Sequence, residues 1–161
     1  MSTPPAEPPL PSNAIQYWEA VLEDLEATIA DYTDNGWTVF EVHPGDVTPV
    51  AADSPGEACG LDVLVPSNEL EDLQAMAEGA DFDAFDVYKQ TEGDVVLLIV
   101  AIKSSGSAQA ILYPAYYDVD EAREMLQSAA ERDRIDSYFR NLADDEGVVF
   151  AHGNPALFRP D

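Results

Sequence analysis

The stretch Val95-Val-Leu-Leu-Ile-Val-Ala-Ile102 decides the fold of this chain, because it is the longest unbroken apolar run and is rich in β-branched residues. A membrane-spanning helix needs about 20 apolar residues, whereas a run of this length suits a buried strand. Alternate residues of a strand point to opposite faces of its sheet, and here both alternate sets are apolar. The sequence therefore predicts a central strand that is covered on both faces. One face holds Val95, Leu97, Ile99 and Ala101, and the other holds Val96, Leu98, Val100 and Ile102.

The segments on either side of this run predict an antiparallel meander. Residues 85–91 alternate imperfectly between apolar and polar side chains, and residues 108–117 form the returning strand. The turns at residues 92–94 and 104–107 are short, which indicates that neighbouring strands run antiparallel. Pro114 has no N–H to donate to a ladder, so the third strand is expected to be an edge strand or to be bulged there.

Residues 13–35 predict a long helix. Ser12 or Asn13 supplies its N-cap, and Gly36 ends it. Its apolar side chains recur at alternating spacings of three and four residues and form one continuous stripe. They are Ile15, Trp18, Leu22, Leu25, Ile29 and Tyr32. Such a stripe packs either on the sheet of its own chain or on a second copy, and we favour the sheet because that arrangement is commoner.

The remaining segments complete an α+β pattern. Strands are predicted at residues 37–43, 61–65 and 148–151, and a loop at residues 44–60. Helices are predicted at residues 67–78 and from Asp118 to about residue 144. The second of these regions forms either one bent helix or two helices. The prediction of a helix in the second half of that region depends on four apolar residues, Ile135, Tyr138, Phe139 and Leu142. We therefore expect an α+β domain over residues 13–161, with a mainly antiparallel sheet of about five to six strands. A β-meander at about residues 85–117 forms its centre, and the long N-terminal helix and the C-terminal helices cover it.

Several features of the chain concern its location. Residues 1–12 contain five prolines and predict a disordered tail before the domain. Cys59 is the only cysteine, so the chain has no internal disulfide framework. The N-terminus shows no basic region followed by an apolar core, and no stretch is long enough to cross a bilayer. We expect a cytoplasmic protein with no membrane partner.

The charge balance is extreme. The chain has 32 acidic residues against 7 basic ones, a net charge of −25 and a pI near 4.1. These like charges repel one another in dilute buffer, whereas in about 1 M salt the Debye length falls to about 3 Å and the repulsion largely vanishes. We interpret the acidity as adaptation to a cytoplasm rich in KCl. The competing interpretation is an acidic decoy that binds a basic partner, and direct binding to nucleic-acid phosphates is disfavoured in either case.

Four short motifs carry a resemblance. They are Tyr17-Trp18-Glu19, Gly36-Trp37, His43-Pro44-Gly45-Asp46-Val47 and Gly60-Leu-Asp-Val-Leu-Val-Pro66. With them the chain resembles an acidic, single-domain protein family of haloarchaea that has no assigned function, over about residues 14–150. The resemblance implies one folded domain and a halophilic source, and it implies no catalytic residues.

Histidine and cysteine supply the candidate site residues for chemistry. His43 and His152 are the only histidines, each at the end of a predicted strand, and Asp46 follows the first of them by three residues. Two histidines and a carboxylate are able to hold zinc or iron, and Cys59 with a histidine is able to act as a thiol nucleophile. The alternative is structural: a polar strand end at His43 and a buried small side chain at Cys59.

Arg132, Arg134 and Arg140 gather much of the scarce positive charge in one region. Arginine forks suit the recognition of carboxylates or phosphates, which makes these residues a candidate anion or partner patch. The alternative is that they pair with acidic neighbours of the same chain. These neighbours are Asp133, Asp136, Asp144 and Asp145.

No glycine-rich phosphate loop occurs, and we expect no cofactor. Our leading interpretation is a non-enzymatic interaction or regulatory module of a halophilic cytoplasm, with a protein partner. One alternative is a small hydrolase-like enzyme or metal-binding protein that uses His43 and Asp46 with His152 or Cys59. The other is the acidic decoy.

Overall fold

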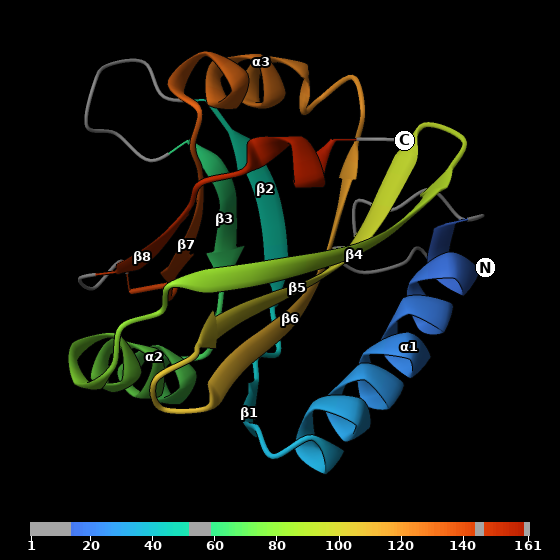
Figure 1. Cartoon of the computed structure of the whole chain (residues 1–161). Helices are drawn as coiled ribbons and strands as arrows, with labels where there is room; N and C mark the ends of the chain where they lie inside the picture. Colours follow the sequence, from blue (N-terminus) through green and yellow to red (C-terminus); the bar gives the residue numbers. More distant parts are fainter. Residues whose placement is uncertain (1–13, 52–58, 144–146, 160–161) are drawn as a thin grey trace.

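The structure is a computed structural model that describes residues 14–51, 59–143 and 147–159. The predicted tail at residues 1–12 lies outside the described residues. Single helices and runs of two or three strands follow one another along the chain in an α+β arrangement (Figure 1). In chain order they are α1 (Ala14–Asp34), β1 (Thr38–Glu41), β2 (Asp46–Val50), β3 (Gly60–Leu64), α2 (Ser67–Gly79), β4 (Ala84–Glu92), β5 (Val95–Ser104), β6 (Gln109–Asp118), α3 (Arg123–Arg132), β7 (Ile135–Arg140), β8 (Val148–His152) and the 3-10 helix η1 (Pro155–Phe158).

The strands of the described residues form two four-stranded sheets, with the orders β1-β6-β5-β4 and β2-β3-β7-β8. The prediction of a single sheet of five to six strands is therefore wrong. Two segments account for the difference. The expected loop at residues 44–60 contains β2, and the expected second helix contains β7. Both of these strands belong to the second sheet.

The first sheet is built on the predicted meander. β4, β5 and β6 pair antiparallel through short turns, which confirms the meander, and β1 adds to β6 in parallel. β5 is an interior strand, and its two faces contact different hydrophobic clusters, as the alternation predicts. Val95, Leu97, Ile99 and Ala101 pack with α1, whereas Val96, Leu98, Val100 and Ile102 pack with the second sheet, α2 and α3.

Pro114 lies in the part of β6 that no longer pairs with β1. The ladder between β1 and β6 extends to Leu112, whose carbonyl also accepts a 2.9 Å hydrogen bond from the backbone N of Val42. Residues two apart turn their backbone groups to the same side of a strand, so the nitrogen of Pro114 faces the side on which β1 has ended. The proline thus removes no ladder hydrogen bond, and the edge expected at this position is present in the second half of β6.

Helix α1 covers the outer face of the first sheet (Figure 1). Leu25 and Tyr32 of the predicted stripe are buried, but Leu22 is 38% exposed and Val21 is 4% exposed in its place. Each helical residue turns by about 100°, so Val21 and Leu25, one turn apart, lie on the same face. The contact face is therefore rotated by one residue from the stripe at this point.

Helix α3 is shorter than predicted. The side chain of Asp118 accepts hydrogen bonds from the backbone N of Asp120 and of Glu121, which forms a turn, and the helix begins only at Arg123. It ends at Arg132, and the backbone of the following Asp133 is left-handed with φ of 55°. That conformation closes a helix and releases the chain into a new direction.

Strand β7 replaces the predicted second helix. Ile135 and Phe139 are fully buried, but Leu142 is 85% exposed. A spacing of four residues places two side chains on one face of a helix and also on one face of a strand, so this apolar pair fits both structures. Pairing decides between them: β7 runs parallel to β3 on one side and antiparallel to β8 on the other.

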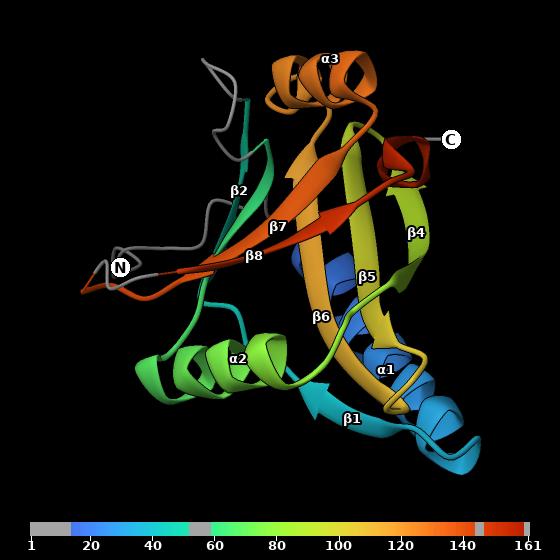
Figure 2. The ribbon, with the colours of Figure 1, turned by 60° about the vertical axis from the view of Figure 1, so that its left-hand side comes forward.

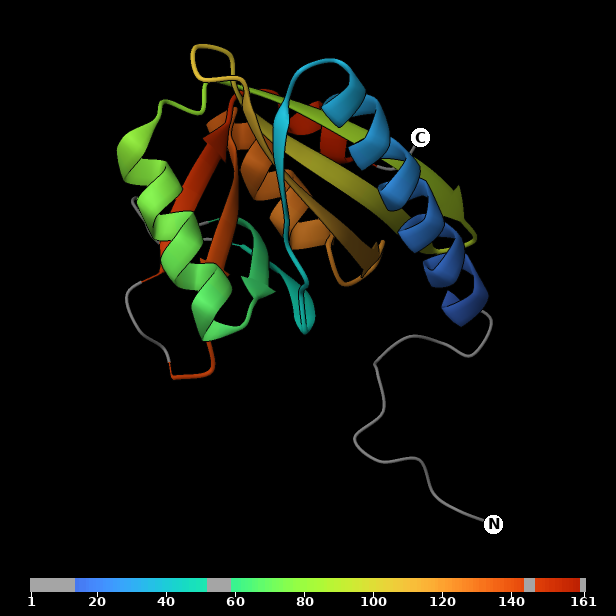
Figure 3. The same ribbon diagram turned by 90° about the horizontal axis from the view of Figure 1, so that it is seen from below.

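The elements form layers. α1 lies on one face of the first sheet and the second sheet faces the other, with α2 and α3 at opposite ends of the space between the sheets (Figure 2). Seen from below, α1 and α2 lie on opposite sides of the molecule (Figure 3). This arrangement leaves β4 at the edge of the first sheet, beside α1.

Candidate functional site

His43 is a surface residue that ties α2 to the connection between β1 and β2. Its Nδ1 lies 2.7 Å from Oε2 of Glu69, and its backbone N donates a 2.9 Å hydrogen bond to Oε1 of the same carboxylate. Nε2 lies 3.5 Å from Glu41, and the side chain is 65% exposed. Asp46, the expected partner of His43, is exposed at the start of β2 and hydrogen-bonds to Thr48 instead.

Cys59 and His152 are both buried, but Ile135 separates them. The backbone N of Asp136 donates a hydrogen bond to the carbonyl of Cys59, which places Cys59 beside Ile135, and Ile135 is paired with His152 on the other side. Two strand spacings amount to about 10 Å. This separation prevents direct contact between the thiol and the imidazole, and Sγ of Cys59 donates instead to the Met125 carbonyl at 3.5 Å.

His152 takes part in a buried polar network that the sequence did not reveal. Its Nε2 lies 3.0 Å from Oγ of Ser137, which in turn lies 2.5 Å from the hydroxyl of Tyr113. The imidazole packs against Phe85 and Phe158. Burial lowers the pKa of His152 to about 4, so its imidazole is neutral at pH 7.

This network contains the atoms of a serine–histidine pair, but it lies in the core. Ser137 is fully buried and His152 is 2% exposed. A nucleophile must reach its substrate, so the arrangement has the character of a satisfied internal network. Recognition of residues 135–140 as a strand would have placed Ser137 in the core from the sequence.

The histidines do not form a metal site in the described part of the chain. Within residues 14–51, 59–143 and 147–159, no group of three or more His, Cys, Asp or Glu side chains is arranged to hold a metal ion. His43 is exposed, whereas His152 is buried among aromatic rings. The four candidates thus lie in separate environments.

Arg134 and Arg140 of the candidate patch pair with carboxylates of the same chain. Nε of Arg134 lies 3.2 Å from buried Asp136, one of the expected partners. Nε of Arg140 lies 2.8 Å and 3.1 Å from the two carboxylate oxygens of Asp62, a partner that was not expected. Arg132 is partly buried in the last turn of α3. Asp144 and Asp145 lie outside the described residues.

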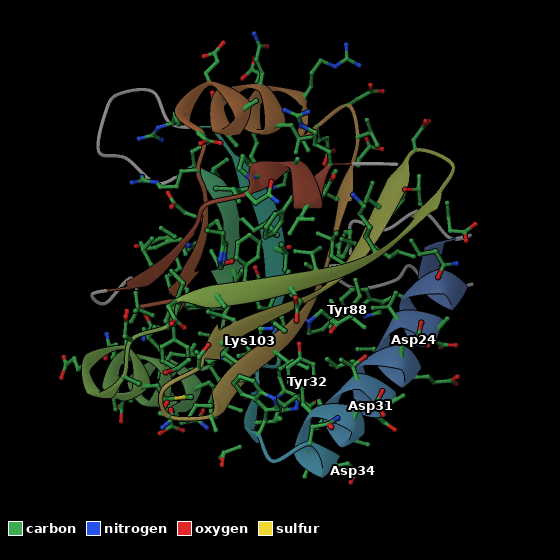
Figure 4. All side chains as sticks on the ribbon, in the orientation of Figure 1. Asp24, Asp31, Tyr32, Asp34, Tyr88 and Lys103 are labelled. Carbon is green, nitrogen blue, oxygen red and sulfur yellow. The ribbon has the colours of Figure 1, made fainter. Side chains whose placement is uncertain are left out.

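The structure instead places a groove between α1 and β4 (Figure 4). It consists of two adjoining hollows of about 250 Å³ and about 310 Å³ that share Asp31 and Tyr88. Asp24 and Thr28 of α1 and Gln90 of β4 also line the first hollow. The second is lined further by Tyr32, Asn35, Trp37, Asp86 and Lys103.

A hydrogen-bonded network centred on Asp86 lies in the second hollow. Oδ2 of Asp86 accepts from the Tyr32 hydroxyl at 2.8 Å and from Nζ of Lys103 at 2.7 Å, and the Tyr32 hydroxyl lies 3.1 Å from that of Tyr88. Burial alone would raise the pKa of Asp86, but the hydrogen bonds from Lys103 and Tyr32 outweigh it and lower that pKa. Burial, followed by its contacts with Tyr88 and Asp86, raises the pKa of Tyr32. The carboxylate is therefore charged and the phenol protonated at neutral pH.

The ammonium of Lys103 also contacts an aromatic ring. Its Nζ lies 5.8 Å from the centroid of the Trp37 ring, and that ring lies 5.9 Å from the ring of Tyr32. A cation over an aromatic face contributes about 0.5–1 kcal/mol at an exposed site. The second hollow thus holds one ammonium group of the protein itself between a carboxylate and an indole.

Two carboxylates of the groove have no such partner among the side chains that the structure describes. Within the described residues, Asp24 and Asp31 have no ion pair with a basic side chain. The chain's two lysines both line the groove, but Lys103 pairs with Asp86, and Nζ of Lys89 donates to the Arg159 carbonyl at 2.5 Å. The lining of the two hollows includes Asp24, Asp31 and Asp86 against Lys89 and Lys103, so acidic side chains outnumber basic ones in the groove.

No helix of the described residues is both long enough and apolar enough to cross a membrane. No curated protein and no solved structure shows significant similarity to this chain. Residues 10–160 match the profile of a family described as a family of unknown function (DUF7529). That match spans nearly the whole chain, and the protein therefore belongs to this family.

Proposed function

We propose that the protein is a non-enzymatic interaction module that binds a basic side chain of a protein partner in the groove between α1 and β4. One observation carries the proposal: Asp86 and Trp37 already hold the Lys103 ammonium at one end of the groove, while Asp24 and Asp31 beside it have no basic partner in the described residues. The groove thus combines an observed arrangement around one ammonium with two aspartates that have no ion pair among the described side chains.

The spacing of the two aspartates suits more than one cationic group. Asp24 and Asp31 are seven residues apart in α1, which corresponds to about two turns and about 10 Å along the axis. Thr28 lies between them, and Tyr88 faces them from β4 with 44% of its surface exposed. A partner therefore finds carboxylates, a hydroxyl and an accessible aromatic ring along one open groove.

The titration behaviour of the groove favours binding over catalysis. A general acid or base works best with a pKa near the working pH. In the groove the pKa of Asp86 is lowered and the pKa of Tyr32 is raised, so both are displaced away from neutrality. A hydrolase or metal-binding function that uses His43 and Asp46 with His152 or Cys59 stays a prediction, and the separate environments of these residues do not favour it.

We also infer that the acidic surface is an adaptation to a cytoplasm of high salt. The 32 acidic residues exceed the 7 basic ones, and Arg134, Arg140 and Lys103 are already paired with carboxylates of the chain. In about 1 M salt the Debye length is about 3 Å, so long-range attraction is lost but contact pairs at hydrogen-bond distance persist. Recognition in the groove then depends on contact, whereas an acidic decoy depends on long-range attraction.

The test is a titration followed by amide NMR, with Nα-acetyl-lysine N-methylamide as the probe and its norleucine analogue as the uncharged control. The groove variant, Asp24→Asn with Asp31→Asn, should weaken binding of the probe by about tenfold or more. The matched control variant, Glu19→Gln with Glu23→Gln, removes the same charge from exposed positions of α1 that do not line the groove. It should bind within about twofold of the parent protein.

Two results would contradict the proposal. Equal weakening in the two variants would show that net charge, not the groove, attracts the probe, as the decoy interpretation requires. The absence of saturable binding to the parent protein in both about 0.1 M and about 2 M KCl would remove the basis for a lysine-binding groove altogether.

A further inference from the structure

We infer that the partner enters as an extended basic segment that adds a fifth strand to the first sheet, along the outer edge of β4. The inference rests on the proposed function, because the basic side chains of the added strand are the groups that the groove receives. The proposed function concerns side chains of the groove alone, and the backbone of β4 is added here as the second part of the interface.

The hydrogen-bonding sides of the strands identify the free edge. The carbonyl of Leu112 faces β1, where it accepts from Val42. Residues at odd positions of β6, such as Tyr113, therefore face β5 and bond its even residues, such as Val100. By the same alternation, Ile99 of β5 faces β4 and bonds its partner Tyr88.

It follows that every second residue of β4 turns its backbone N–H and C=O away from the sheet. These residues are Phe85, Val87, Lys89 and Thr91. β4 is the last strand of its sheet and is nine residues long. Within the described residues, no backbone hydrogen bond occupies the outward groups of Phe85, Val87 or Thr91. Such an edge is a template for an incoming strand.

The groove lies over β5, between α1 and β4, on the face of the sheet to which Asp86, Tyr88 and Gln90 point. Alternate side chains of an added strand would point the same way, spaced by about 7 Å. They would reach the groove next to Tyr88, where Asp24 and Asp31 of α1 supply the charge. The groove therefore selects basic residues at every second position of the segment.

The other side chains of the added strand would meet a surface that is apolar at Phe85 and Val87, with Lys89 and Thr91 of β4 on the same side. Phe85 and Val87 point to that side and pack against the core cluster. The neighbouring η1 contacts β4 and carries Leu157, which is 38% exposed. The segment that fits both sides alternates basic and apolar residues.

Charge excludes a second copy as the preferred occupant. Pairing of two β4 edges would bring Asp86 and Glu92 of one copy close to those of the other, between molecules that each carry a net charge of −25. Charged residues at an edge strand are a common protection against such self-pairing. A basic segment gains from the same charges.

The test uses the full chain and the peptide acetyl-Lys-Val-Lys-Val-Lys-Val-Lys-amide. A second peptide of the same sequence carries N-methyl groups on its central amides, which blocks strand addition but keeps every charge. We expect the unmodified peptide to bind about tenfold or more tightly than the methylated one. It should also slow amide hydrogen exchange at Phe85, Val87 and Thr91 by about tenfold or more, which the single-lysine probe should not do.

A substitution in β4 tests strand addition through a change in the protein, in place of a change in the peptide. Val87→Pro removes an outward N–H and leaves the bonds of Tyr88 to β5 in place. This variant should bind the unmodified and the methylated peptide with similar affinity, and it should still bind the single-lysine probe. If Val87→Pro fails to fold, the methylated peptide gives the same comparison on the parent protein.

The outcomes separate the two proposals. Equal binding of the two peptides with no protection of the β4 amides, together with weaker binding by the Asp24→Asn, Asp31→Asn variant, would overturn strand addition and leave the groove intact. Failure of both peptides and of the lysine probe to bind would overturn both.

Discussion

The ammonium of Lys103 lies 2.7 Å from Oδ2 of Asp86, although the two residues belong to different strands, β5 and β4. Ala84 is the pairing partner of Lys103, so the ion pair reaches diagonally across the ladder to a residue two positions further along β4. The same carboxylate oxygen accepts from Tyr32 of α1. This single oxygen thus joins the helix to the sheet at the end of the groove.

Replacement of Lys103 by Met should destabilise the protein modestly and in a pH-dependent way. We expect a loss of about 0.5–1 kcal/mol at neutral pH, because Asp86 is partly exposed and the pair is screened by solvent. The pKa of Asp86 is lower in the folded protein than the unfolded value of about 3.9, so the stabilisation is present above about pH 4. It is lost as the pH falls through the lower folded value.

Urea unfolding at neutral and acid pH measures this loss. The control is Lys103→Met in an Asp86→Asn background, where the titrating carboxylate is absent. There the effect of Lys103→Met should be the same at both pH values. A pH-independent loss with Asp86 present would show that the two groups do not interact.

His152 should make the protein less stable in mild acid. Its pKa is lowered to about 4 by burial, against about 6.5 in the unfolded chain. Between these values the unfolded state binds the additional proton, so stability falls as the pH decreases from about 6.5 to about 4, by about 3 kcal/mol in total. Replacement by Gln should flatten this part of the profile, and His43→Gln, at an exposed position, is the control. An unchanged slope in His152→Gln would mean that another group causes it.

Two substitutions in adjacent turns of α1 test which face of the helix contacts the sheet. Leu25 is 2% exposed on the sheet, and an aspartate there would bury an unpaired charge. Leu25→Asp should therefore abolish the cooperative unfolding transition. Leu22→Asp, at a position that the sequence stripe also includes, should cost less than about 1 kcal/mol. Similar circular dichroism and melting for both variants would contradict the observed orientation of α1.

Gly60 should tolerate no side chain. It has φ of +156°, and a Cβ there would collide with the backbone of Asp136 in the neighbouring strand β7. Gly60→Ala should destabilise by about 3 kcal/mol or more. Gly79→Ala is the matched control, because a Cβ at Gly79 meets nothing within 4 Å. Equal urea midpoints for these two variants would argue against the parallel contact between β3 and β7.

The sequence was sufficient for features that depend on local pattern. The two apolar faces of residues 95–102 follow from alternation alone, and the short turns around them determine the antiparallel meander. Helix α1 follows from its periodic apolar residues, and only the choice between Val21 and Leu22 needed the sheet against which the helix packs.

The second sheet depended on contacts that local pattern does not encode. Ile135 and Phe139 fit a helix as well as a strand, and their pairing with β3 and β8 decides the matter. β2 contains Pro49, which the sequence associates with a loop, but an edge strand accepts it.

The groove was not predicted for the same reason. Tyr32 and Asp86 are separated by 54 positions, and only the packing of α1 beside β4 joins them. The sequence did contain one signal: both of its lysines line this groove. The histidine and cysteine candidates depend on residue type alone, and residue type does not reveal that Cys59 and His152 are enclosed in the core.

The acidity itself is tested by thermal melts in about 0.1 M and about 3 M KCl. With a net charge of −25, screening of self-repulsion should raise the melting temperature in the concentrated salt. NaCl should act similarly, since no selective ion site is involved. An unchanged or lower melting temperature would contradict adaptation to high salt and favour the decoy interpretation.

The most direct test of the binding groove is the position of a bound lysine side chain. Intermolecular NOEs from the ε-methylene protons of Nα-acetyl-lysine N-methylamide, recorded in about 2 M KCl, locate it without any mutation. We expect NOEs to the ring of Tyr88 and the methyl group of Thr28, which lie on opposite walls of the groove. NOEs confined to other acidic surfaces, or none under conditions that saturate binding, would contradict it.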